Sequence, residues 1–399
     1  MGKLLQRAVL AAAVGATLAT GQPGIGQSVA TVQASFADNA ARAPIHFELF
    51  RGSRIFFQGM VDGHPAQFML DSGAAMTVID PSFAAGAGIV PGQAISVRGA
   101  SGTTEGHLAN ATVQAGGLTL SQTRVLLLDI ATISRQIGRK IDVVLGRDAF
   151  EAGIVDLDFE QRTLHFRSAE GFVQPSGSTK VPVSVVNGIR RVPIAIEGAG
   201  PILADLDLGN GAALLVSHKV WTASPALSGL PNARTQAGGV GGVTERRGVT
   251  LPAITIAGQR IARVPAILNA ADAELPTDGA NVGIDILQRF RMSLDFRHGA
   301  IYLTPLAHML ARPLPKDRLG MRLDLAGEHL QVAYVSPDGP AAKAGWKAGD
   351  VLESVNGVPA DARLFATRYA RFSALPAGTH LDLVRADGTH LPVTLTDYF

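Results

Sequence analysis

The hydrophobic residues of this chain fall into many short runs that are separated by turn-forming residues. Two such runs, 55–61 and 67–70, lie on either side of Asp62-Gly63, and the run 181–186 ends at Asn187-Gly188. Both dipeptides are typical of two-residue hairpin turns. The chain also contains 45 glycines and 22 prolines, most of them between apolar runs. This pattern predicts short strands joined by tight turns, and therefore an all-β fold.

One apolar run differs from the others because it lies at the N-terminus behind a basic start. Lys3 and Arg7 precede the uninterrupted run 8–20. That run is shorter than the roughly 20 residues that a membrane-spanning helix needs. Its layout is typical of a secretory signal peptide, and cleavage after Gly21 or after Ala34 fits equally well. We therefore assign 1–34 to a signal peptide, predict an exported, periplasmic or secreted protein, and expect no membrane span in the mature chain.

Composition removes several classes of function. The chain has no cysteine, which excludes disulfide frameworks, thiolate metal sites and cysteine nucleophiles. The net charge of +2 is accounted for by Lys3 and Arg7, so the remainder is neutral and we expect no nucleic-acid partner. The histidines show no metal-ligand spacing, and neither a phosphate-binding loop nor a nucleophile elbow occurs. We therefore predict no metal and no cofactor.

The most informative feature is an internal repeat. A first unit contains Leu70-Asp71-Ser72-Gly73, then Val144-Leu145-Gly146, then Val155-Asp156-Leu157-Asp158-Phe159. The same order returns as Leu206-Asp207-Leu208-Gly209, Asn281-Val282-Gly283 and Met292-Ser293-Leu294-Asp295-Phe296. The three pairs of motifs are separated by 136, 137 and 137 positions. An offset that holds across three motifs indicates two copies of one β-rich lobe, which we place at 48–170 and 178–306.

Asp71 and Asp207 hold equivalent places at the end of an apolar strand and before a tight turn. If the two copies pack about a pseudo-twofold axis, the two turns meet at that axis. Two carboxyl groups about 3 Å apart cannot both ionise, so they share one proton. The ionised group then takes a proton from water while the protonated group polarises a carbonyl. This arrangement predicts hydrolysis by general acid–base catalysis.

At these residues the chain resembles the aspartic proteases of the retropepsin-like and pepsin-like superfamily. The resemblance covers about 48–305 and rests on Asp71-Ser72-Gly73-Ala74, the Val144-Leu145-Gly146 element and their second copies. It implies a bilobal body in which Asp71 and Asp207 are the catalytic pair and Ser72, Gly73 and Gly209 support them. It also implies that the glycine-rich stretches 99–102 and 238–242 are the tips of flap-like hairpins that close over an extended peptide.

The second copy departs from the family pattern at one position. Leu208 stands where a threonine or serine is usual, so it has no hydroxyl to hydrogen-bond across the lobe junction. Three alternatives therefore remain open. Asp205 is the functional carboxylate if the register is shifted by two; the second lobe is a non-catalytic, degenerate copy; or Asp71 pairs with its counterpart in a homodimer. Asp148 and Asp285, which precede apolar turns, are interpreted as helix N-caps.

The C-terminal segment 317–399 has a different pattern. It contains Gly339-Pro340-Ala341-Ala342, then Gly349-Asp350-Val351-Leu352 and an Asn356-Gly357 turn, with a helix expected over 363–374. It resembles a PDZ domain, a β-sandwich with two helices. Such domains bind an extended peptide along a sheet edge and hold its terminal carboxylate on backbone N–H groups. The resemblance assigns that role to Leu319, Gly320 and Met321; the neighbouring Arg318 and Arg322 are interpreted as solvated.

The leading hypothesis is an exported aspartic-type endopeptidase whose PDZ domain recruits or gates polypeptide substrates. The competing hypothesis is a peptide-binding protein whose protease body has lost catalysis, and Leu208 motivates it. Both predict polypeptides as partners, including a C-terminal peptide in the PDZ groove.

Overall fold

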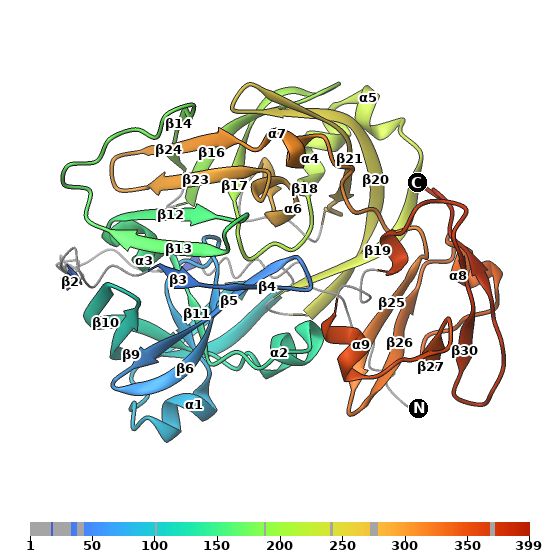
Figure 1. Cartoon of the computed structure of the whole chain (residues 1–399), viewed down its shortest axis with the longest axis horizontal. Helices are drawn as coiled ribbons and strands as arrows, with labels where there is room; N and C mark the ends of the chain where they lie inside the picture. Colours follow the sequence, from blue (N-terminus) through green and yellow to red (C-terminus); the bar gives the residue numbers. More distant parts are fainter. Residues whose placement is uncertain are drawn as a thin grey trace.

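The computed structural model describes residues 17–18, 33–37, 44–99, 102–186, 189–239, 242–271, 278–367 and 372–399. Strands dominate these residues and the helices are short, which confirms the expected all-β fold. The predicted signal peptide at 1–34 and the Asn187-Gly188 turn lie wholly or largely outside the described residues. Figure 1 shows two stacked lobes that share a sheet at one side, with the C-terminal domain beside both lobes.

Lobe 1 is built on a ten-stranded sheet. Its path is β1 (Thr17–Leu18), β8 (Ala94–Gly99), β9 (Gly102–Ala115), β10 (Leu118–Leu127), β7 (Val78–Ile79), β11 (Val143–Leu145), β6 (His64–Leu70), β5 (Arg54–Val61) and β4 (Glu48–Phe50), with β2 (Gln33–Phe36) paired to β10. Its helices are α1 (Pro81–Gly86), α2 (Ala131–Ile137) and α3 (Arg147–Ala152). The predicted Asp62-Gly63 turn joins β5 to β6, and both residues have positive φ, as a type I′ turn requires.

Lobe 2 repeats this topology in the same strand order. Its eight-stranded sheet runs β15 (Ser184–Val186), β16 (Ile189–Ile196), β17 (Gly200–Leu206), β22 (Ala280–Val282), β18 (Leu214–Val216), β21 (Gln259–Leu268), β20 (Gly242–Ile256) and β19 (Asn232–Gly239). Its helices are α4 (His218–Ala223), α5 (Pro225–Ser228) and α6 (Ile284–Leu287). Even the additional pairing of β5 with β9 recurs as β16 with β20. The repeat read from the sequence is therefore a repeat of structure.

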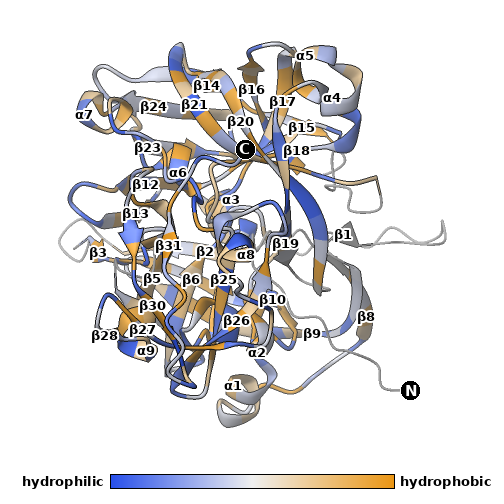
Figure 2. Ribbon diagram, turned by 90° about the vertical axis from the view of Figure 1, so that its right-hand side faces the viewer, coloured by the Kyte–Doolittle hydropathy of each residue, from blue (hydrophilic) through white to orange (hydrophobic). Residues whose placement is uncertain are grey.

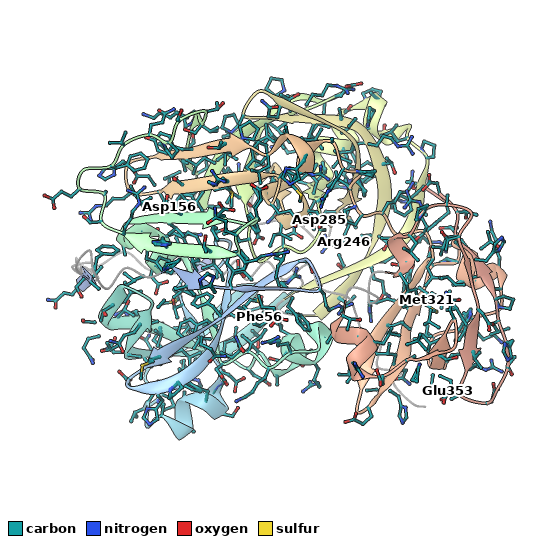
Figure 3. All side chains as sticks on the ribbon, in the orientation of Figure 1. Phe56, Asp156, Arg246, Asp285, Met321 and Glu353 are labelled. Atoms are coloured by element: carbon teal, nitrogen blue, oxygen red, sulfur yellow. The ribbon has the colours of Figure 1, made fainter. Side chains whose placement is uncertain are left out.

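The lobes are joined by a six-stranded sheet to which both contribute. Its order is β14 (Thr179–Pro182), β24 (Ala300–Pro305), β23 (Phe290–Asp295), β12 (Ile154–Asp158), β13 (Thr163–Arg167) and β3 (Ile45–His46). At its centre β12 pairs antiparallel with its own repeat, β23, with Asp156 opposite Ser293. Because equivalent strands pair antiparallel there, the pseudo-twofold axis passes through this pair. Asp156 lies on this sheet in Figure 3, and its Oδ1 accepts a hydrogen bond of 2.5 Å from Ser293 Oγ.

The hydrophobic core follows the alternation of the strands. One buried cluster runs through lobe 1, the shared sheet and lobe 2 without interruption, and it includes Phe68, Phe150 and Phe290. A second cluster fills the other face of the lobe 1 sheet beneath α2 and includes Phe56. Figure 2 shows the hydrophobic residues concentrated inside the lobes, whereas much of the β19–β20 hairpin is hydrophilic. The continuous core makes the two lobes one packed body.

The C-terminal domain is a small β-sandwich. One sheet contains β25 (Met321–Ala326), β26 (His329–Val335), β27 (Val351–Val355), β28 (Val358–Pro359) and β30 (Leu383–Arg385), and the other contains β29 (His380–Leu381) and β31 (Val393–Thr394). Its helices are α8 (Pro340–Lys343) and α9 (Ala362–Ala366), and α7 (Ala307–Leu310) lies in the preceding connection. The helix expected over 363–374 is not one continuous helix: α9 ends at Ala366, where Thr367 is extended, and a separate 3₁₀ turn covers 372–374, while 368–371 lie outside the described residues. Asn356-Gly357 forms the predicted turn between β27 and β28.

This domain contacts both lobes. The Arg234 N–H on β19 donates to Asp338 at 2.9 Å, and the Arg234 carbonyl accepts from Ser336 Oγ at 2.7 Å. On the lobe 1 side, the Arg51 guanidinium lies 3.9 Å from the centre of the Phe365 ring. Helix α2 lies next to β25. The domain is therefore packed against the body on the side that carries β25 and α9.

Candidate active site

Each of the two predicted aspartates lies directly after a buried strand. Asp71 follows β6, and its backbone N–H donates to the Leu145 carbonyl of β11 at 3.0 Å. Asp207 follows β17, and its N–H donates to the Val282 carbonyl of β22 at 3.0 Å. Strand pairs β6–β11 and β17–β22 are parallel, so each carboxylate lies at the end of two adjacent strands. The same local structure places the same side chain in both lobes.

The glycine of each apolar-apolar-glycine element explains why the loop after the aspartate can fold back. A Cβ on Gly146 would lie 2.3 Å from the Met76 carbonyl oxygen, and one on Gly283 would lie 2.2 Å from that of Ala212. Any side chain there would displace the loop that follows Asp71 or Asp207. The motif seen in the sequence is therefore a packing requirement of the two aspartate turns.

The structure brings Asp71 and Asp207 together at the junction of the lobes. A Cβ on Gly73 would lie 2.8 Å from the carboxyl carbon of Asp207, and one on Gly209 would lie 2.2 Å from that of Asp71. Each turn therefore lies against the carboxyl group of the other lobe. The two carboxyl groups are within hydrogen-bonding contact, and both residues are 0% exposed. The pairing takes place within one chain and requires no second copy.

Backbone donors hold one oxygen of each carboxyl group. Asp71 Oδ1 accepts from the N–H groups of Gly73 at 2.8 Å and Ala74 at 3.1 Å. Asp207 Oδ1 accepts from those of Gly209 at 2.8 Å and Asn210 at 3.0 Å. These bonds fix the orientation of both carboxyl planes relative to the axis.

The second oxygens differ between the lobes. Asp207 Oδ2 accepts from Asn281 Nδ2 at 2.7 Å, whereas Asp71 Oδ2 accepts from no N–H or O–H group in the described part of the chain. Burial raises the pKa of both carboxyl groups. The charge of Asp207 raises the pKa of Asp71 further, while Asn281, Asp71, the Gly209 N–H and Arg54 act to lower the pKa of Asp207. The Asn281 donor on Asp207 Oδ2, with no counterpart on Asp71 Oδ2, therefore favours the negative charge on Asp207 and the shared proton on Asp71.

Asn281 gives a pH-dependent prediction. Its equivalent in lobe 1 is Val144, so Asn281→Val makes the two lobes alike at this strand. Removing a donor to Asp207 Oδ2 destabilises the ionised form and raises the pKa of Asp207. If the dyad cleaves peptides, the acidic limb of the kcat/KM profile should move to higher pH, because a higher pH is then needed to ionise Asp207. Gln58→Ala, which removes an exposed amide of lobe 1, should leave the limb in place; an unshifted limb in Asn281→Val would contradict the assigned role.

The link across the lobe junction is one-sided. Ser72 Oγ donates to the Leu206 carbonyl at 2.7 Å and accepts from the Leu208 N–H at 3.0 Å. Leu208, the equivalent residue in lobe 2, is buried and has no hydroxyl to make the reciprocal pair. One half of the expected cross-lobe link is thus present, and Ser72 alone makes it.

We expect Ser72→Ala to destabilise the protein more than an ordinary serine truncation. It leaves the buried Leu206 carbonyl and Leu208 N–H without partners, at about 1–3 kcal/mol for each unsatisfied group. Thermal unfolding should therefore occur at a clearly lower temperature. Ser228→Ala, which removes an exposed hydroxyl, serves as the matched control. Equal melting temperatures for the two variants would show that the one-sided link contributes nothing.

Other sequence-based interpretations are corrected or replaced. Asp205 is not the second carboxyl group of the dyad: Asp207 contacts Asp71, and Asp205 instead pairs across the sheet with Arg191 at 3.2 Å, with both side chains buried. Asp148 and Asp285 are not N-caps. The caps of α3 and α6 are Gly146 and Gly283, so both aspartates lie within the first turn. Asp148 instead accepts from Thr77 Oγ1 at 2.7 Å, and burial raises its pKa to about 6.

The two glycine-rich stretches form hairpins as expected. Gly99 pairs with Gly102 between β8 and β9, and Gly239 pairs with Gly242 between β19 and β20. The residues at the tips, 100–101 and 240–241, lie outside the described part of the chain. Their role as flaps stays a prediction.

The residues predicted to bind a peptide carboxylate lie where β25 begins. Leu319 and Gly320 precede this strand and Met321 opens it. The N–H groups of Leu319 and Gly320 already have an acceptor, because Asp317 Oδ1 takes hydrogen bonds of 3.0 Å and 3.2 Å from them.

The arginines beside this loop are not the solvated side chains that the sequence suggested. Arg322 is buried, pairs with Asp324 at 3.1 Å and donates to Gln236 of β19 at 3.1 Å. Arg318 pairs with Asp397 at 2.7 Å. For Arg322 the reason is packing against lobe 2 through Gln236, whereas Arg318 is held within the domain by Asp397 and the Ala374 and Leu375 carbonyls.

Two functional candidates were missed by sequence reasoning. Asn281 is a polar residue in a buried apolar element whose first copy has Val144, and aligning the two repeats shows that difference. Asp317 stands two residues before Leu319, a spacing at which an aspartate caps backbone N–H groups. Among the described residues, no cluster of metal-ligating side chains occurs and no helix is long and apolar enough to span a membrane.

Comparison with known proteins agrees with this geometry. Residues 57–149, which contain Asp71 and the Gly146 element, match the family model described as aspartyl protease. Residues 331–372 match the family model described as PDZ domain. A search of curated proteins gave no significant match. The chain therefore contains a retropepsin-like aspartyl protease domain in its first lobe and a PDZ domain near its C-terminus.

Proposed function

We propose that this protein is an exported aspartic-type endopeptidase in which Asp71 and Asp207 activate water. The observation that carries the proposal is the contact of two buried carboxyl groups across a pseudo-twofold axis. Each is held by two backbone N–H groups, and they differ in their remaining partners. The match of 57–149 to the aspartyl protease family supports a peptidase function in general.

The asymmetry of the dyad suggests a role for each member. Asp207, which carries the charge, removes a proton from a water molecule as that water attacks the peptide carbonyl carbon. Asp71 donates its proton to the carbonyl oxygen, which gives a neutral tetrahedral diol. The diol collapses when Asp207 returns its proton to the amide nitrogen and Asp71 recovers one from a diol hydroxyl. The C–N bond breaks and both carboxyl groups regain their starting protonation states.

Within this proposal the PDZ domain recruits or gates polypeptide substrates. Its contacts with Arg234 and Gln236 connect it to the β19–β20 hairpin, which is the flap candidate of lobe 2. Export rests on the N-terminal pattern of basic start and apolar run, and it places the enzyme in the periplasm or outside the cell.

The experiment is a cleavage assay on the full chain. A reduced and alkylated globular protein serves as substrate over about pH 3 to 7, the range in which a carboxyl dyad changes protonation, and mass spectrometry locates the cut sites. We expect internal cuts. A peptide analogue with a secondary alcohol in place of the scissile carbonyl should block them, because it resembles the tetrahedral species. A chelator should have no effect.

The alternative, a peptide-binding protein without catalysis, is favoured by Leu208, which leaves the lobe junction with one hydroxyl instead of two. It predicts no cut at any pH in this assay while labelled peptide still binds to the full chain. That combination of results would replace the peptidase proposal.

A further inference from the structure

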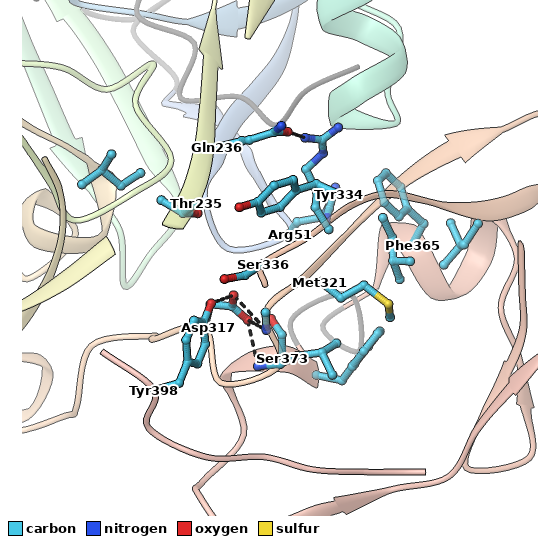
Figure 4. A pocket seen from close by; sticks show the side chains of 17 residues that line it. Arg51, Thr235, Gln236, Asp317, Met321, Tyr334, Ser336, Phe365, Ser373 and Tyr398 are labelled. Carbon is cyan, nitrogen blue, oxygen red and sulfur yellow. Dashed lines mark hydrogen bonds between the residues drawn. The ribbon is translucent and has the colours of Figure 1, made fainter. Parts of the chain in front are cut away.

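A pocket of about 270 Å³ lies between the PDZ domain and the protease body. The PDZ side supplies the loop at Leu319 and Gly320 together with apolar side chains such as Met321 and Phe365. The body supplies Arg51 from lobe 1 and Thr235 and Gln236 from β19, and Figure 4 shows these labelled side chains around the opening. Met321 lies on the side of the domain that faces the body, whereas Glu353 lies on the far side (Figure 3). A chain bound in this pocket would touch both domains.

The position that would receive a chain end is already filled by a carboxyl group of the protein. Asp317 Oδ1 accepts from the N–H groups of Leu319 and Gly320, and Asp317 Oδ2 accepts from Tyr398 Oη at 2.7 Å. The dashed lines in Figure 4 mark these bonds. Burial raises the pKa of Asp317, while the hydrogen bonds from Tyr398, the Leu319 and Gly320 N–H groups and Ser373 oppose that rise. The N–H groups are occupied in either protonation state, because a neutral carboxyl group also accepts.

Among the described residues that line the pocket, no cation is left unengaged for a second carboxylate. Arg322 is paired with Asp324 and bonded to Gln236, and Arg51 lies over the Phe365 ring. A terminal carboxylate entering here would meet the Asp317 carboxylate instead, and like charges at short range repel. A neutral stretch of backbone meets no such cost.

The remaining features suit a neutral, extended chain. The described strand partner of β25 is β26 alone, which makes β25 an edge strand of its sheet, and a peptide can hydrogen-bond to such an edge. The Tyr334 hydroxyl lines the pocket and has no hydrogen-bond partner in the described part of the protein, so it can donate to a peptide carbonyl. The volume lies just below the usual range for ligand pockets, which fits a few residues of chain.

We propose that this pocket binds an internal, extended segment of a polypeptide and that Asp317 excludes free C-terminal chain ends. The inference rests on the proposed function only in identifying that polypeptide as substrate. Since Thr235 and Gln236 belong to β19, the bound segment lies against the flap candidate of lobe 2. Asp317 is thus a specificity-determining residue, and the substrates selected are chains engaged away from their ends.

The test measures binding with the full chain carrying Asp71→Asn, so that it is independent of cleavage. Two isotope-coded pools of degenerate nonapeptides, identical except that one ends in a carboxylate and the other in a carboxamide, compete for the protein. A photo-crosslinking residue at position 235 captures peptides in the pocket, and one at position 387 on an exposed turn is the control. We expect crosslinks at 235 only, with the carboxamide pool captured at least as well as the carboxylate pool.

Asp317→Ala frees the two N–H groups, and it should shift the captured ratio toward carboxylate peptides by about tenfold, as expected for regained charge-assisted hydrogen bonds. Asp317→Asn keeps a side-chain acceptor for the two N–H groups but removes the charge, and Tyr398→Phe removes one hydrogen bond to Asp317. Both variants should shift the captured ratio less than Asp317→Ala does. Asp387→Asn should not shift it. Any one of three results would overturn the inference: the Asp71→Asn protein prefers carboxylate peptides, the captured ratio is unchanged in Asp317→Ala, or no crosslink forms at position 235. Failure of the peptidase proposal would show only in the cleavage assay.

Discussion

Asp71→Asn and Asp207→Asn should each reduce peptide cleavage by about 10³-fold or more, since each removes an acid or base that acts in the transition state. In Asp71→Asn the proton for the carbonyl oxygen is lost. In Asp207→Asn the group that accepts the proton of water is lost. Initial rates on a quenched fluorescent peptide, measured per folded molecule, provide the readout.

The stability of the Asp71→Asn protein should not fall with its activity. Burial and the neighbouring charge raise the pKa of Asp71, so folding favours its protonated form. The stabilising contribution of that protonated carboxyl is complete below the ordinary aspartate pKa and is lost as pH rises through the folded value. Asp71→Asn has no carboxyl group at position 71 to ionise, so it does not lose stability in this way as pH rises. Its unfolding temperature should therefore match or exceed that of the parent near neutral pH. The difference between the two proteins should shrink in acid.

Asp205→Asn is the informative control because Asp205 lies two residues from Asp207. It breaks a buried ion pair with Arg191, and it should lower stability by about 3–5 kcal/mol. Its folded fraction should still cleave at the parental rate. If Asp205→Asn instead abolished cleavage and Asp207→Asn did not, the dyad would be misassigned.

Gly209→Ala should produce the second largest loss of activity. Its Cβ would lie 2.2 Å from the carboxyl carbon of Asp71 and 2.4 Å from both of its oxygens. One of the two turns has to move, and because each turn carries a catalytic candidate, the dyad geometry is lost. A displacement of about 1 Å costs about 10²-fold in rate. The strain should lower stability by about 1–3 kcal/mol.

Two further glycine-to-alanine variants serve as comparisons for Gly209→Ala. Gly73→Ala should be milder, since its Cβ would lie 2.8 Å from the carboxyl carbon of Asp207. Gly86→Ala places its Cβ in open space at the end of α1 and should change neither rate nor stability. Full activity in Gly209→Ala would mean that the two turns are not in contact in solution.

Much of this fold follows from local pattern. The Asp62-Gly63 and Asn356-Gly357 turns form where they were expected, because a type I′ turn depends on two adjacent residues with positive φ. The equal spacing of three motifs predicted a duplicated lobe, and the strand orders of the two sheets repeat one another. Asp71 and Asp207 were chosen from that repeat, and the structure places them in contact.

The amino-acid sequence by itself determined the strands, the turns, the duplication and the choice of two carboxyl groups, because each depends on residues that are close along the chain or repeated at one offset. Only the tertiary structure decided that Ser72 bonds across the lobe junction to the backbone beside Asp207, that Asn281 makes the dyad asymmetric and that Arg322 is buried against Gln236. These features depend on contacts between residues tens to more than a hundred positions apart. No local pattern encodes such contacts, since their energies arise from packing and desolvation when the lobes and the PDZ domain come together.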